Sequence, residues 1–252
     1  MKTHYKKLAN LASIAGLSSY LVLGTASRAS AMHIAEGFLP IQWAAFWWVV
    51  SLPFFIVGLR SLIRITRLNP ELKLLLALSG AFTFVLSALK IPSVSGSCSH
   101  PTGTGLGAIL FGPSVMTVMG ALVLLFQAVL LAHGGVTTLG ANLFSMAIVG
   151  PFVAYFVYHA LLKTGKPRVA IFCAAALENL LTYAVTAFQL ALAFPAASGG
   201  FMASFLKFLG VFALTQVPLA ISEGLLTVLV WNWLQTYGKP EMDLLKLLNQ
   251  EA

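Results

Sequence analysis

Long apolar runs separated by short polar segments dominate the chain from residue 41 onward. Most of these runs can cross a hydrocarbon core of about 30 Å as helices that rise about 1.5 Å per residue. They lie at 41–62, 72–90, 114–132, 139–163, 169–194 and 201–234. A short helix is predicted at 103–112, because proline in Gly112-Pro113 cannot continue a helical hydrogen-bond ladder. The pattern predicts an all-α integral membrane protein with about seven transmembrane helices, of which the third is short.

Composition agrees with a single polytopic membrane domain, which we expect to occupy residues 32–252. The 252 residues are 59% hydrophobic and only 9% charged, and the mean hydropathy is +0.90. Soluble domains carry roughly a quarter charged residues. The formal net charge of +8 does not indicate nucleic-acid binding, because the basic residues are spread over the ends of the apolar runs. That placement is typical of cytoplasmic loops beside membrane lipid.

The first 31 residues are predicted to be a cleaved signal peptide. Lysines within residues 2–7 precede a weakly apolar stretch at 8–23, and Ala29-Ser30-Ala31 supplies the small residues of an A-x-A cleavage site. Cleavage would make Met32 the new N-terminus and would leave it outside the cell. The alternatives are an uncleaved signal anchor or one further membrane span.

Basic residues predict the orientation of the helices in a bacterial cytoplasmic membrane. The positive clusters after the runs at 41–62 and 139–163 both favour the cytoplasm. Both can lie there only if the short helix at 103–112 counts as a crossing, which requires the polar loop at 93–104 to be re-entrant from outside. The C-terminus is then cytoplasmic. The residues behind this assignment are Arg60, Arg64, Arg67, Lys73, Lys163, Lys166, Arg168 and Lys239.

Two external polar segments could together hold a divalent transition metal. If Met32 is a free N-terminus, its amine and the amide nitrogen of His33 close a five-membered chelate ring. That amide nitrogen and the near imidazole nitrogen of His33 close a six-membered ring. One further nitrogen, such as the imidazole of His100, would complete a square. Planar nitrogen coordination suits Ni²⁺, Cu²⁺ or low-spin Co²⁺ rather than Zn²⁺, Mg²⁺ or Ca²⁺. Affinity should fall at low pH, because the amine and amide must lose protons.

Other polar residues allow both structural and functional interpretations. Cys98 and Ser99 could be outer-shell groups, and a Cys98 thiolate would favour a different geometry. His133, at the outer end of the run at 114–132, is interpreted mainly as a loop cap; the alternatives are a role in metal entry and a role as an outer-shell partner. Glu178 and Glu223 lie within apolar runs, and we favour interhelical hydrogen bonding over metal passage for them.

In the segments around His33 and His100, and in much of the chain that follows, the sequence closely resembles the CbiM family. Members of this family are the substrate-capture (S) components of energy-coupling-factor (ECF) cobalt transporters. The resemblance covers residues 32 to about 240, and its first two motifs are the specific ones. The matching segments are MHIAEGFLP at 32–40, PSVSGSCSHPTGTGLGAILFGP at 92–113, LLFQAVLLAHGGVTTLGANLFSMAIVGPFVAYFVY at 124–158 and ALENLLTYAVTAFQLAL at 176–192.

The resemblance implies a ligand set, partners and a pathway. It implies that Co²⁺ is held by the Met32 amine, the His33 amide and imidazole, and His100. It implies a CbiQ-like transmembrane coupling protein, a CbiO-like ATPase and a CbiN-like auxiliary membrane protein, in service of cobalamin biosynthesis. The GSCSHPTG form around His100 resembles the cobalt branch more than the nickel branch. Ni²⁺ stays an alternative on physical grounds.

Two other function classes compete with metal capture. An intramembrane metalloprotease would need zinc ligands with a general base, and the sequence contains no HExxH motif. A proton-coupled secondary transporter could use Glu178 and Glu223, but no inverted repeat supports it. The chain also lacks a P-loop, so an ATP-driven process would need a separate ATPase.

Overall fold

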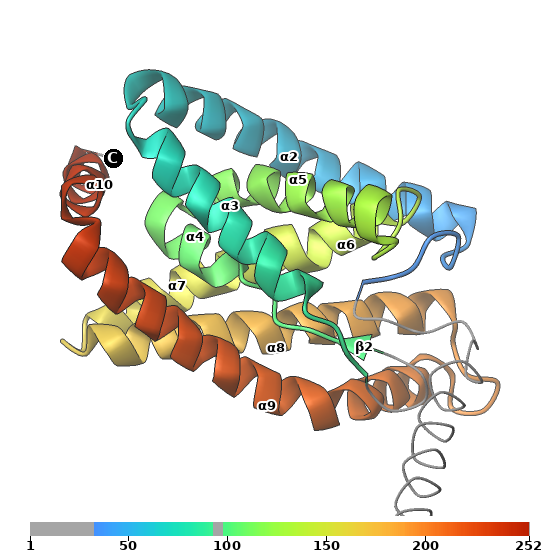
Figure 1. Cartoon of the computed structure of the whole chain (residues 1–252). Helices are drawn as coiled ribbons and strands as arrows, with labels where there is room; N and C mark the ends of the chain where they lie inside the picture. The colour runs from blue at the N-terminus through green and yellow to red at the C-terminus, as the bar shows by residue number, and fades with distance from the viewer. Residues whose placement is uncertain (1–32, 93–97, 252) are drawn as a thin grey trace, which may run out of the picture.

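Apolar helices make up most of the structure, a computed structural model that describes residues 33–92 and 98–251 (Figure 1). The first half contains α2 (Ile41–Leu68), α3 (Leu72–Ala88), β1 (Ile91–Pro92), β2 (Cys98–Ser99), α4 (Thr104–Phe111) and α5 (Pro113–Leu131). The second half contains α6 (Leu139–Asn142), η2 (Leu143–Val149), α7 (Gly150–Leu162), α8 (Pro167–Ala193), α9 (Gly200–Tyr237) and α10 (Lys239–Glu251). The predicted signal peptide at 1–31 and Met32 lie outside the described residues.

The break between α4 and α5 lies at the predicted Gly112-Pro113 pair. The Gly112 amide closes α4 by donating to the Ala108 carbonyl, and its φ of +84° turns the chain where other residues would be strained. Pro113 then occupies the first turn of α5, where a missing N–H costs nothing. Every residue of α4 is buried, so this short helix runs through the interior of the bundle.

A π-helix, η2, joins α6 to α7 in one continuous rod from Leu139 to Leu162. Pro151, the second residue of α7, lacks the N–H of a regular α-helical bond. Single π-helical turns inside α-helices are frequent at functional sites. Here the wider turn carries Met146, which points into the polar interior described below.

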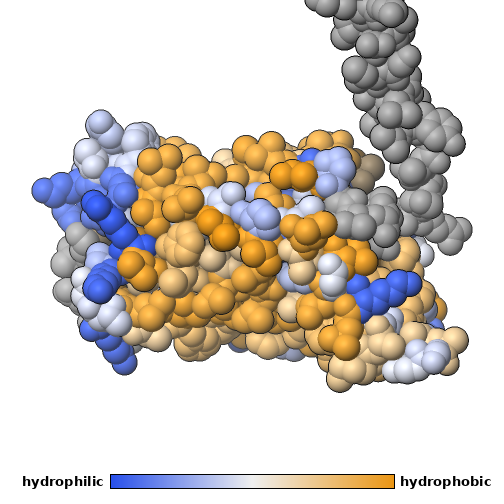
Figure 2. Space-filling model, turned by 90° about the horizontal axis from the view of Figure 1, so that it is seen from below, coloured by the Kyte–Doolittle hydropathy of each residue, from blue (hydrophilic) through white to orange (hydrophobic). Residues whose placement is uncertain are grey.

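Apolar side chains cover the outside of the bundle. Val49, Leu74 and Leu214 each leave at least 70% of their surface exposed. Figure 2 shows an apolar band between two more polar ends on the face in view. Exposed apolar area on this scale does not suit a water-soluble surface. Among the described residues, five helical segments are long and apolar enough to cross a membrane; they are 41–68, 113–131, 139–162, 167–193 and 200–237. The chain is an all-helical multi-pass membrane protein.

One end of the bundle carries most of the described positive charge. The α2–α3 turn, the α7–α8 turn and the start of α10 all lie there (Figure 1). The basic residues in these turns or in the adjoining helix ends are Arg64, Arg67, Lys73, Lys163, Lys166, Arg168 and Lys239. The opposite end contains the β1–β2 ribbon and the α8–α9 turn, with Lys90 and Lys207 nearby.

Helix boundaries agree with those predicted to within a few residues, apart from α2, which extends to Leu68. The sequence pattern did not predict the ribbon, in which Ile91 pairs with Ser99 and Pro92 with Cys98, or helix α10. The ribbon is too short to show a strand pattern. Helix α10 has a polar composition, and it packs through Met242 and Leu245 against the ends of α3 and α9.

Close packing of α6 on α2 depends on Gly140. A Cβ at this position would lie 2.6 Å from the backbone nitrogen of Trp48. The hydroxyl of Ser51 on α2 donates to the Gly140 carbonyl at 2.9 Å. We therefore expect Gly140→Ala to lower the free energy of unfolding by about 1–3 kcal/mol, measured by thermal unfolding of the detergent-solubilised protein.

Gly210→Ala in α9 is the matched control, because no atom lies within 4 Å of its added Cβ and alanine favours the helix. Equal melting temperatures for both variants would contradict the packing argument.

Candidate metal centre

Three histidines from distant parts of the sequence converge in the interior near the ribbon end of the bundle. His33 lies on the N-terminal strap (residues 33–40), His100 follows β2, and His133 follows α5. The ring centroid of His33 lies 4.4 Å from the His100 centroid and 4.4 Å from the His133 centroid. The His100 and His133 centroids are 4.8 Å apart. Candidate ligand atoms of the three side chains all lie within 4.8 Å of one another. We call these residues the histidine cluster.

Hydrogen bonds assign the free nitrogen of two cluster histidines. Nε2 of His33 lies 3.0 Å from Sδ of Met146, and Nδ1 of His100 lies 2.8 Å from the carbonyl oxygen of Pro101. Each partner is an acceptor, so each of these ring nitrogens carries the proton. Nδ1 of His33 and Nε2 of His100 are buried without a hydrogen-bond partner in the described part of the chain. Each ring therefore offers one lone pair to a metal ion.

Burial keeps the cluster uncharged. The histidines are at most 2% exposed. Desolvation lowers the pKa of His100 to about 4 and that of His133 to about 2, and the positive charge of Lys90 acts in the same direction. Desolvation, followed by repulsion from the other two rings, holds the pKa of His33 well below its usual value. At neutral pH all three imidazoles are neutral, with one N–H and one lone pair each, which is the form that binds metals.

Asn142, the last residue of α6, fixes the strap immediately after His33. Its side-chain oxygen accepts from the Ile34 amide at 2.8 Å, and its nitrogen donates to the Ile34 carbonyl at 3.0 Å. The hydroxyl of Thr138 donates to the same carbonyl at 2.6 Å. Both polar groups of Ile34 are therefore held by α6 and its cap, which fixes the backbone that carries the His33 ring.

The rest of the strap is held by the loop that follows His133. The Glu36 amide donates to the Gly134 carbonyl at 3.2 Å, and the Glu36 carboxylate accepts from the Thr137 amide. That carboxylate has a lowered pKa, chiefly because of its hydrogen bonds to Thr137. The Gly37 amide donates to the Thr137 hydroxyl at 3.1 Å. The strap and the α5–α6 loop thus form one layer over the histidine cluster.

A second network holds the histidine loop (residues 98–103). The carboxylate of Glu223 on α9 accepts from the amide and hydroxyl of Thr102 and from the amide of Gly103. It also accepts from the side chain of Asn179 on α8. The buried loop thus reaches a residue past the midpoint of α9, which agrees with the predicted inward course of this segment.

The same network reaches His100 through a glutamine. The side-chain nitrogen of Gln216 on α9 lies within bonding distance of both the His100 carbonyl, at 3.1 Å, and the Asn179 side-chain oxygen, at 2.6 Å. Glu178 on α8 accepts from the Thr104 hydroxyl. Both buried acids connect separate elements, in agreement with the structural role favoured for them by the sequence.

The structure brings together two of the three sequence-predicted ligands, His33 and His100, and adds His133. Met32 lies outside the described residues, one position before the buried His33. Cys98 is half-buried and is not part of the cluster. The interpretation of the His133 side chain as a loop cap is wrong, because neither ring nitrogen has a hydrogen-bond partner among the described residues. The sequence signal that could have identified His133 as a cluster residue was its predicted position at the same end of the bundle as the other two histidines.

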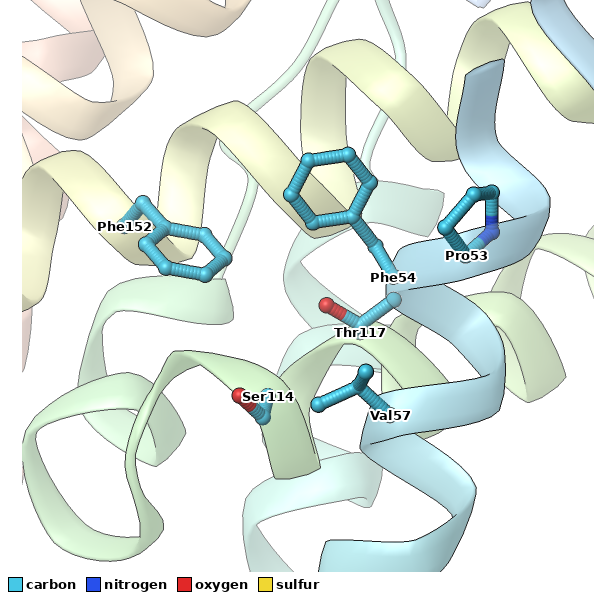
Figure 3. Close-up of a pocket in the computed structure, with 6 residues that line it drawn as sticks. All are labelled: Pro53, Phe54, Val57, Ser114, Thr117 and Phe152. Atoms are coloured by element: carbon cyan, nitrogen blue, oxygen red, sulfur yellow. The ribbon is translucent and has the colours of Figure 1, made fainter. Parts of the chain in front are cut away.

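A separate hollow of about 280 Å³ opens where α2, α5 and α7 diverge (Figure 3). Its only side-chain polar atoms are two hydroxyls of α5, and that of Thr117 is bonded to the Pro113 carbonyl. Hydroxyls and apolar groups are poor ligands for a divalent transition metal, so the histidine cluster is the better candidate for a metal site. The lining residues are Pro53, Phe54, Val57, Ser114, Thr117 and Phe152.

Comparison with known proteins connects this geometry to metal transport. Residues 33–242 match the CbiM family model, described as the cobalt uptake substrate-specific transmembrane region. A cobalt transport protein CbiM from Nostoc sp. is 68% identical over 247 residues, which cover 98% of this chain and 95% of the relative. A cobalt transport protein CbiM from Moorella thermoacetica is 61% identical over 236 residues, which cover 92% and 91%.

A solved structure agrees with the family match. A crystal structure of a truncated transition metal transporter superposes with a TM-score of 0.70 at 26% sequence identity, covering 81% of this chain and 99% of the other. The chain therefore belongs to the CbiM family of substrate-specific membrane components for cobalt uptake, and it is a transporter component rather than an enzyme.

Proposed function

We propose that this chain captures Co²⁺ from outside the cell in a planar site made by the Met32 amine, the His33 amide and imidazole, and the His100 imidazole. The observation that carries the proposal is a pair of buried nitrogens, His33 Nδ1 and His100 Nε2, that have no hydrogen-bond partner among the described residues and belong to rings whose centroids lie 4.4 Å apart. In His33 the free nitrogen is the one nearer the backbone. It is therefore the nitrogen that can close a six-membered ring with the residue's own amide.

Processing of residues 1–31 is part of the proposal, because only cleavage supplies an α-amine at Met32. The buried position of His33, at 1% exposure, supports it. A long leader would have to leave the structure directly beside a buried residue. The freed amine instead becomes a ligand, and its positive charge is lost when the metal displaces its proton.

The orientation that we propose places the histidine cluster toward the outside. The basic end of the bundle is then cytoplasmic, in keeping with the positive-inside rule. Counting α3 and the short α4 with the five longer segments gives seven crossings in the mature chain. The buried α4 lets the re-entrant loop present His100 from the external side, where the ion arrives.

We propose that the energy for import comes from partners. The chain would work with a CbiQ-like coupling protein, a CbiO-like ATPase and a CbiN-like membrane protein, and would supply cobalt for cobalamin biosynthesis. Ni²⁺ is the second candidate cargo, because a planar set of nitrogens also suits that ion. A proton-coupled transporter receives less support, because the structure uses Glu178 and Glu223 as hydrogen-bond acceptors between elements.

The mature N-terminus should begin at Met32, and its amine should be essential. Mass spectrometry of the purified protein should find Met32 first. A variant that retains one extra residue ahead of Met32 after cleavage should lose high-affinity Co²⁺ binding, because the amine no longer closes its five-membered ring. Unchanged affinity of the extended protein in calorimetry would contradict the chelate.

Removal of either imidazole should abolish high-affinity binding without loss of the fold. We expect His33→Ala and His100→Ala each to weaken Co²⁺ binding by more than about 100-fold, the upper end of what loss of an outer-shell partner costs. His159→Ala is the matched control, because this exposed histidine lies in the last turn of α7. Normal radiocobalt accumulation in cells that carry either ligand variant would rule out that ligand.

Cobalt uptake should depend on an ATPase encoded separately. In cells that carry the complete system, deletion of the ATPase or inactivation of its P-loop should stop uptake, because the sequence of this chain contains no P-loop. Uptake that survives ATPase loss but collapses with a protonophore would favour the secondary-transporter alternative.

A further inference from the structure

His133 is the one cluster histidine that the planar chelate leaves without a role. Its ring lies about equally far from the His33 and His100 rings, with centroids 4.4 and 4.8 Å away. It is inclined to them by 43° and 87°, respectively. It is therefore a direct neighbour of both ligand rings.

The side chain of His133 is buried, and its backbone is fixed where α5 ends. The side chain is 2% exposed, and neither ring nitrogen has a hydrogen-bond partner in the described part of the chain. Its backbone amide donates to the Gln127 carbonyl at 3.0 Å. Ala132 before it has a φ of +47°, a left-handed conformation that is unfavourable for a residue with a Cβ. Such strain persists where the surrounding structure imposes it and is concentrated at functional sites.

A buried imidazole with two unpartnered nitrogens is costly unless another partner engages it. The four planar positions of the proposed chelate are occupied by the Met32 amine, the His33 amide and imidazole, and His100. A further donor can reach the ion only along the axis perpendicular to that plane. An apical donor is adjacent to every basal donor, and the His133 ring lies beside both the His33 ring and the His100 ring.

We propose that His133 is an axial fifth ligand of the bound ion, and that it selects Co²⁺ over Ni²⁺. This inference rests on the proposed function. It adds one ligand to the planar set and assigns selectivity to it.

The selectivity follows from the occupation of the metal d orbitals. In a strong planar field of nitrogens, Ni²⁺ has a filled orbital along the axis, so an axial donor is repelled. Low-spin Co²⁺ has only one electron in that orbital, so an axial imidazole forms a bond. Without an axial ligand, a planar nitrogen site should bind Ni²⁺ more tightly than Co²⁺, following the general order of divalent metal affinities. His133 would thus oppose the intrinsic preference of the basal ligands.

Electron paramagnetic resonance of the anaerobic Co²⁺ complex tests this ligand directly. The unpaired electron of low-spin Co²⁺ lies along the axis, so a single axial nitrogen should split each high-field line into three. Protein grown with ¹⁵N-labelled histidine should give two lines instead. A wild-type spectrum without nitrogen splitting would overturn the proposal without any variant being made.

Substitution of His133 tests selectivity. His133→Phe keeps an aromatic ring, slightly larger and without a donor nitrogen, and His133→Ala serves if the larger ring disturbs the fold. We expect the splitting to disappear and Co²⁺ affinity to fall about tenfold or more, on the scale of losses around metal sites. Ni²⁺ affinity, measured by the same calorimetry, should stay nearly unchanged. His159→Phe should change neither.

The outcomes separate this inference from the proposed function. Splitting that persists in the His133 variants, or equal losses of Co²⁺ and Ni²⁺ affinity, would overturn the axial role while the planar site stands. Retained binding in His33→Ala and His100→Ala would instead refute the planar site on which the inference rests.

Discussion

The structure depends on keeping three uncharged imidazoles buried side by side, with candidate ligand atoms within 4.8 Å of one another. Water would satisfy the lone pairs of these rings, and protons would remove them as ligands. Exclusion of both requires the polar backbone around the histidine cluster to find its partners within the protein. The Asn142 and Thr138 contacts to Ile34 and the Glu223 contacts to Thr102 and Gly103 meet this requirement.

The anchors of the cluster come from different parts of the bundle. Asn142 belongs to the α6–η2–α7 rod, which also supplies Met146 to His33. Glu223 and Gln216 belong to α9 and hold the histidine loop, with Asn179 of α8 between them. The relative positions of the ligands therefore depend on helix packing. Small residues such as Gly140 set that packing, and they lie away from the cluster itself.

Sequence reasoning predicted the helices because length and hydropathy determine which segments can span a membrane. It located the α4–α5 break because Gly112-Pro113 has a local conformational effect. It brought His33 and His100 together through topology, since both fall on the same predicted side. It could not predict the use of Met146, because the π-helix that directs this side chain has no clear sequence signature. It misjudged His133, because only tertiary structure shows that its ring points inward.

Several polar atoms of the histidine cluster have no hydrogen-bond partner among the described residues. Unpartnered nitrogens of His33, His100 and His133 are buried together, and each such atom costs about 1–3 kcal/mol. Packing and the hydrogen bonds of the strap and the histidine loop offset that cost before any ion arrives. A metal that accepts one lone pair from each ring removes most of the penalty without further ordering of side chains. Part of the binding free energy is therefore supplied during folding, which is the physical meaning of preorganisation in this bundle.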